Sequence, residues 1–144
     1  MRKSLRKMFA LILFLVTGTW LTASDVSDVP THVESVVSGG YWKSGGQDGR
    51  YRIIVVNNGW EHVHSLVFLQ WLEENHEKQE TTTRFSVPIR EINEAHTWSV
   101  ARPEFSDKNE IKMHATNTYS QEAKVFIVRP DVEGKYKVEE QKIR

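Results

Sequence analysis

Beyond residue 31, hydrophobic residues occur in short runs that are separated by glycine, proline or polar clusters. In residues 110–119 the pattern alternates, with Ile111, Met113 and Ala115 on one side and polar residues between them. Residues 81–89 alternate in the same way. Successive side chains of a β-strand point to opposite faces, so this period of two predicts half-buried strands.

The strongest local signal is a hairpin. Residues 50–57 form an apolar, β-branched run, and Asn58-Gly59 follows it directly. Asn-Gly between two β runs is typical of a tight two-residue turn, because that turn needs positive φ at both central residues. The sequence therefore predicts that residues 60–72 form the partner strand.

The middle of this partner strand, residues 65–72, is apolar on both alternating faces. Such a run is typical of a central strand with both sides covered. A helix over residues 63–77 is the alternative, because leucine, glutamine and glutamate are good helix formers. The hairpin signal directly before it favours the strand.

The same rhythm of short strands and turns extends over the rest of the chain. Further strands are expected over residues 33–43, 96–102, 124–129 and 134–138. Gly39-Gly40 suits a bulge, and residues 44–49 and 73–80 are expected to be loops. About eight short strands predict an all-β fold, a single β-sandwich of immunoglobulin-like architecture, with a small antiparallel barrel as the alternative.

The first 24 residues differ in composition from the rest of the chain. Four basic residues precede an unbroken apolar run over residues 8–16, and small residues follow at Ala23 and Ser24. This order predicts a signal peptide over residues 1–23, a flexible leader over 24–31 and the β domain over 32–144. A retained anchor would need about 20 apolar residues, so stable membrane insertion after cleavage is not expected.

Composition narrows the class of protein. Without the signal, 15 of the 19 lysines and arginines remain against 19 acids, a net charge of −4. Nucleic-acid binding is not expected, because it needs a basic patch. The absence of cysteine excludes thiol catalysis and cysteine metal sites. No Asn-x-Ser/Thr acceptor occurs, which favours a bacterial envelope, periplasmic or secreted, over a eukaryotic secretory route.

His62-Val63-His64 is the best candidate for a metal site. Residues two apart in a strand share a face, so both imidazoles could bind one zinc or copper ion, with His96, His114 or a carboxylate as third ligand. A lone His-x-His pair nevertheless favours ordinary surface or cross-strand histidines, and the metal site is the alternative. Ordinary histidines predict no cofactor.

Aromatic residues offer a second candidate. Tyr41, Trp42 and Trp60 flank glycine-rich turns and are expected to be partly exposed, as a ligand face. Trp71 and Trp98 lie within apolar runs and are expected in the core. The strand over residues 50–57 lies between the turn near Tyr41 and Trp42 and the turn near Trp60. The ligand face could therefore be one surface or two separate sites.

No catalytic set stands out. The acids of residues 73–80 lie in a charged segment, and the serines and glycines form neither a nucleophile elbow nor a phosphate loop. The sequence therefore favours an exported non-catalytic binding or accessory module for a protein or glycan of the envelope. The alternatives are a metal-binding protein or metal-dependent enzyme using His62 and His64, and a structural subunit that pairs through a strand edge. The oligomeric state stays open.

Overall fold

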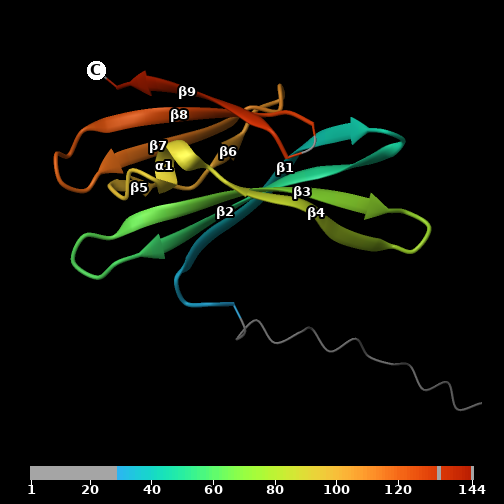
Figure 1. Cartoon of the computed structure of the whole chain (residues 1–144), viewed down its shortest axis with the longest axis horizontal. Helices are drawn as coiled ribbons and strands as arrows, with labels where there is room; N and C mark the ends of the chain where they lie inside the picture. The colour runs from blue at the N-terminus through green and yellow to red at the C-terminus, as the bar shows by residue number, and fades with distance from the viewer. Residues whose placement is uncertain (1–28, 133, 144) are drawn as a thin grey trace, which may run out of the picture.

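A computed structural model describes residues 29–132 and 134–143, which form two antiparallel β-sheets packed face to face (Figure 1). The first sheet has the order β1-β2-β3-β4, and the second has the order β5-β7-β8-β9 with β6 paired to β7. The elements are β1 (Val33–Ser44), β2 (Gln47–Asn58), β3 (His64–Asn75), β4 (Glu80–Pro88), α1 (Arg90–Asn93), β5 (Trp98–Val100), β6 (Glu104–Phe105), β7 (Ile111–Asn117), β8 (Ala123–Pro130) and β9 (Tyr136–Lys142). The predicted all-β sandwich is confirmed, and the sheets do not close into a barrel.

The connectivity is simpler than that of an immunoglobulin domain. Strands β1 to β4 follow one another as neighbours in the first sheet, and the chain then enters the second sheet and stays there. Immunoglobulin-type sandwiches instead exchange strands between their sheets in Greek-key order. The sandwich architecture was thus predictable, whereas the strand order, with β1 to β4 in one sheet and β5 to β9 in the other, was not.

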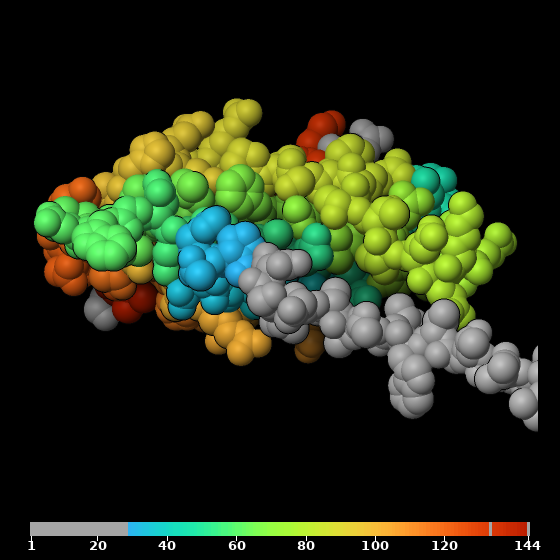
Figure 2. Space-filling view, turned by 90° about the horizontal axis from the view of Figure 1, so that it is seen from below, coloured from blue at the N-terminus to red at the C-terminus, as the bar shows by residue number. Residues whose placement is uncertain are grey.

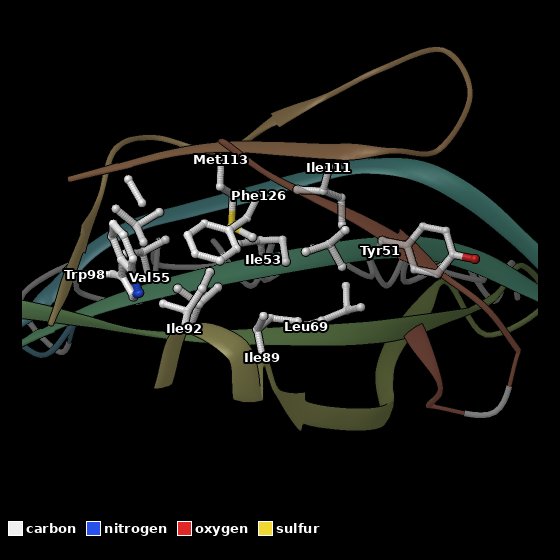
Figure 3. Packing of buried hydrophobic residues seen from close by; sticks show 14 of the residues in the cluster. Tyr51, Ile53, Val55, Leu69, Ile89, Ile92, Trp98, Ile111, Met113 and Phe126 are labelled. Carbon is white, nitrogen blue, oxygen red and sulfur yellow. The ribbon is translucent and has the colours of Figure 1, made fainter. Parts of the chain in front are cut away.

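The core lies between the sheets and follows the alternation of the sequence (Figure 3). The first sheet contributes Tyr51, Ile53, Val55, Val67, Leu69 and Trp71. The second contributes Ile111, Met113, Ala115, Phe126 and Val128. Ile53, Leu69 and Phe126 are fully buried, so one face of each central strand is removed from water, which is the main favourable term in folding.

Two turns differ from the expectation. The tight two-residue turn joins β1 to β2 at Gly45-Gly46, where both φ angles are positive and Ser44 pairs with Gln47. Asn58 pairs with His64 in the β2–β3 ladder, so the predicted Asn58-Gly59 turn is wrong and a five-residue loop, 59–63, replaces it. The expected loop over residues 73–80 is also shorter, because β3 continues to Asn75 and β4 begins at Glu80.

Strand β4, the neighbour of β3, ends at Pro88. Beyond that point, side-chain hydrogen bonds take the place of the ladder between the two strands. The Asn93 side chain accepts a hydrogen bond from the Val67 N–H at 2.7 Å and donates one to the Val67 carbonyl at 3.1 Å. The buried Ser65 hydroxyl accepts a hydrogen bond from the Val100 N–H at 2.8 Å. These contacts satisfy backbone groups that burial would otherwise leave unpaired, and they fix β5 beside β3.

The predicted signal peptide and residues 24–28 of the leader lie outside the described residues. Within residues 29–132 and 134–143, no helix has the length and hydrophobicity needed to cross a membrane.

Candidate functional site

Two hairpin tips, one from each sheet, meet at one end of the sandwich (Figure 1). The β2–β3 loop carries His62, and the β7–β8 turn carries Tyr119. The two rings pack together with centroids 4.7 Å apart and planes tilted by 34°. Asn117 shapes the β7–β8 turn, because its side-chain oxygen accepts hydrogen bonds from the Tyr119 and Ser120 N–H groups, each at 3.0 Å.

Two aromatic rings at this end are open to solvent. Trp60 is 95% exposed and Tyr119 is 62% exposed. Single exposed hydrophobic residues are common on protein surfaces, but an almost fully exposed indole contributes little to folding. Large amphipathic rings of this kind are enriched where proteins bind ligands and partners.

A hollow of about 330 Å³ lies at the same end of the sandwich, lined by the chain neighbours of Trp60 and Tyr119 and not by the two rings themselves. Its lining is polar apart from Val63 and consists of Glu61, His62, Val63, Ser99, Thr116, Thr118 and Gln121. Thr118 donates to the Thr97 carbonyl at 3.2 Å, and Gln121 donates to the Thr118 carbonyl at 3.3 Å. The lining therefore presents hydroxyl, amide, imidazole and carboxylate groups, of which two are held by hydrogen bonds. We call Trp60, Tyr119 and this lining the hairpin-tip site.

The structure does not bring Tyr41 and Trp42 to this site. Both lie near the β1–β2 hairpin, at the opposite end of the sandwich (Figure 1). Trp42 is 6% exposed, belongs to the core and donates its indole N–H to the Leu72 carbonyl at 3.1 Å. The expectation that Trp42 is partly exposed is therefore wrong.

A bulge explains the position of Trp42. The register shifts between Gly39 and Trp42, so three residues of β1 span the two-residue step from Tyr51 to Gly49. The shift turns Trp42 inward and Tyr41 outward. Asn109 holds the bulge, because its side chain accepts from the Tyr41 N–H and donates to the Tyr41 carbonyl, each at 2.9 Å.

Tyr41 is half exposed, and its hydroxyl donates a hydrogen bond to Asp48. This bond lowers the pKa of the Asp48 carboxyl and raises that of Tyr41. Tyr41 therefore has a local partner within its own hairpin, whereas the structure gives the Trp60 ring no such contact among the described residues.

His62 and His64 have separate neighbours. His62 packs on Tyr119, whereas the His64 ring lies edge-on to His96 at a centroid distance of 5.3 Å. His62 lies in the loop and β3 begins only at His64, so the rule that residues two apart share a strand face does not apply to this pair. In the described part of the chain, no group of three or more histidine, cysteine, aspartate or glutamate residues is placed to hold a metal ion.

Sequence reasoning found Trp60 and His62 but missed the β7–β8 contribution of Thr118, Tyr119 and Gln121. The only local signal was a polar turn, Asn117-Thr118-Tyr119-Ser120, between two predicted strands. Nothing in that turn indicates which other loop it meets.

Comparison with known proteins does not assign the chain to a family: no family model, curated protein or solved structure matches it.

Proposed function

We propose that this chain is an exported, non-catalytic binding module that recognises a carbohydrate chain of the cell envelope through the hairpin-tip site. The observation that carries the proposal is the 95% exposed ring of Trp60, which directly precedes Glu61 in a loop whose residues 61–63 line a hollow together with hydroxyl and amide side chains. A sugar ring offers an apolar C–H face that stacks on an indole and hydroxyl groups that pair with such a lining.

The charges of the hollow favour a ligand that is not anionic. Glu61 is the one carboxylate among the seven lining residues, and no lysine or arginine lines the hollow. Hydrolysis of a glycosidic bond usually requires two carboxyl groups on opposite sides of that bond. A single carboxylate is sufficient to accept a hydrogen bond from a sugar hydroxyl, which supports binding without cleavage.

Export rests on the sequence of residues 1–23 and predicts a defined mature terminus. The chain recovered from the periplasm or the medium should begin near Ser24 or Asp25 when its N-terminus is sequenced. Recovery of chains that begin at Met1 from washed membranes would contradict export by a cleaved signal.

The binding site is tested by replacing Trp60 with alanine. We expect the melting temperature to change by less than about 1 °C, because truncating a solvated ring creates no cavity. Retention on neutral oligosaccharides, measured on a glycan array and by affinity electrophoresis, should fall about 5- to 10-fold, since an aromatic stacking contact contributes about 1–1.4 kcal/mol.

Two further variants serve as controls. Trp60→Tyr keeps a stacking ring and should retain part of the binding, and Tyr41→Ala removes a ring at the opposite end and should leave binding unchanged. Tryptophan fluorescence adds a direct readout, because Trp42, Trp71 and Trp98 are buried and Trp60 is not. Equal glycan binding by the wild type and Trp60→Ala would contradict the proposed site.

A further inference from the structure

The outer face of the first sheet carries an apolar band. Val36 pairs with Ile54, Ile54 with Phe68 and Phe68 with Pro88, so one hydrophobic row crosses all four strands. In the adjacent outward row, Val56 pairs with Leu66. We call these six residues the apolar band. Leu66 and Phe68 belong to this band, which is why β3 is apolar on its outward face as well as on its buried face.

The band has no layer over it among the described residues. The inward neighbours Ile53 and Val67 are fully buried, whereas Ile54 and Phe68 are only half-buried and Val36 is 51% exposed. The second sheet packs on the opposite face of the first, and Figure 2 views the molecule from the side of the first sheet. A contiguous exposed hydrophobic patch is typical of an interaction surface.

A polar row borders the band on one side and lies flat on the sheet. Arg52 donates to the Gln70 side chain at 2.7 Å, and Gln70 donates to Ser86 at 3.1 Å, so hydrogen bonds link β2, β3 and β4. The Arg52 guanidinium forms no ion pair with a carboxylate of the described residues. A half-buried cation next to an apolar band favours a partner that supplies both an apolar surface and an acceptor.

The opposite border of the same face supplies such an acceptor. Asn58 and His64 pair there, with Asn58 Nδ2 3.3 Å from His64 Nε2, which leaves the Asn58 side-chain oxygen as an acceptor. Glu34 on the neighbouring strand β1 does not belong to this border, because its carboxylate accepts a hydrogen bond from the Asn57 side chain at 2.9 Å, and Asn57 lies in the inward row of β2 together with its partner Ser65. The face thus has a cation on one border, an amide oxygen that can accept a hydrogen bond on the other, and the apolar band between them.

We propose that this face binds the same face of a second copy of the chain. A two-fold axis that lies between the two sheets and runs across their strands would place band on band. It would also place the Arg52 row of each copy over the Asn58 border of the other. Such an isologous contact is closed, so it gives a dimer and not a fibre.

The size of the face sets the expected affinity. Two of the outward rows cross all four strands, the Val56 row crosses three and the Asn58 row two. With strands about 4.8 Å apart and outward rows about 6.8 Å apart, these positions give a footprint of roughly 400 Å² per copy. Stable interfaces bury about 800 Å² per partner, and transient ones bury less. We therefore expect a dimer that dissociates in the micromolar range.

Sedimentation velocity of the exported chain at about 5–200 µM tests this proposal. The wild type should pass from one to two chains per particle within this range. Phe68→Lys should stay monomeric and weaken dimerisation at least about 100-fold, because the dimer would bury an ammonium group that the monomer leaves in water. His114→Lys, which adds the same charge to the exposed outer side of β7, should leave the dissociation constant unchanged.

Val36→Lys gives a second variant if Phe68→Lys does not fold, because Val36 is half exposed on the edge strand β1. A wild type that is monomeric at 200 µM would overturn the proposal, and so would a dimer that persists in both lysine variants. A monomeric wild type that binds phosphatidylcholine vesicles through Val36 would also overturn it and would assign the band to lipid.

Discussion

Trp71→Ala should lower the free energy of unfolding by about 3–5 kcal/mol, the cost typical of truncating a buried aromatic residue. Trp71 is 1% exposed at the centre of the first sheet. Its ring makes edge contacts with Tyr51 and Phe85 at centroid distances of 5.8 and 6.2 Å. Its indole N–H donates to the Asp131 carbonyl at 2.9 Å and thus ties β3 to the β8–β9 turn.

Urea denaturation of three variants separates the contribution of the buried Trp71 ring from that of its hydrogen bond to Asp131. Trp71→Phe keeps an aromatic ring but loses the hydrogen bond to Asp131, so its loss of stability should be smaller than that of Trp71→Ala. Trp60→Ala removes the same atoms from a solvated ring and should cost less than about 0.5 kcal/mol. Equal losses in Trp60→Ala and Trp71→Ala would contradict the assignment of one ring to the surface and the other to the core.

The strands of this fold were predictable because their signal is local. Alternation in residues 110–119 is reproduced by β7, where Ile111, Met113 and Ala115 are buried and the residues between them are exposed. Trp71 and Trp98 could be assigned to the core for the same reason, since each lies within an apolar run. Periodicity reports which face of a strand is buried, and this property depends little on distant residues.

The bulge expected at Gly39-Gly40 is confirmed by the register shift there, but its effect on the side chains that follow was not predictable. Trp42 is buried because a one-residue shift at Gly39-Gly40 reverses the faces of β1, and Asn109, far along the sequence, holds that shift. His62 is separated from His64 because the β2–β3 loop has five residues and not two. A one-residue change of register moves every following side chain to the other face.

The candidate site was predictable only in part, for a related reason. Trp60 stands out by its position beside Asn58-Gly59, but the β7–β8 turn joins it only through the packing of the two sheets. Strand order is a property of the whole chain, so no pattern around Tyr119 indicates that it meets His62.

Gly49→Ala should also destabilise the protein strongly, by about 3 kcal/mol or more, because overpacking at this position involves backbone. Gly49 is buried in β2 between Trp42 on β1 and Glu73 on β3. A Cβ at this position would overlap the Leu72 carbonyl oxygen and lie 2.8 Å from the carbonyl carbon. That same oxygen accepts the Trp42 indole N–H at 3.1 Å, so the chain cannot move it without disturbing the core.

Gly45→Ala is the matched control for this second prediction. Gly45 has a φ of +58°, and a Cβ there would meet nothing within 4 Å, so the substitution carries backbone strain of about 1 kcal/mol without a steric clash. In thermal unfolding, the melting temperature of Gly49→Ala should therefore be well below that of Gly45→Ala. Equal melting temperatures of the two variants would contradict this prediction. The close approach of β2 to the Leu72 carbonyl would then not be the reason for glycine at position 49, because Trp42 and β3 would have room to adjust around a methyl group.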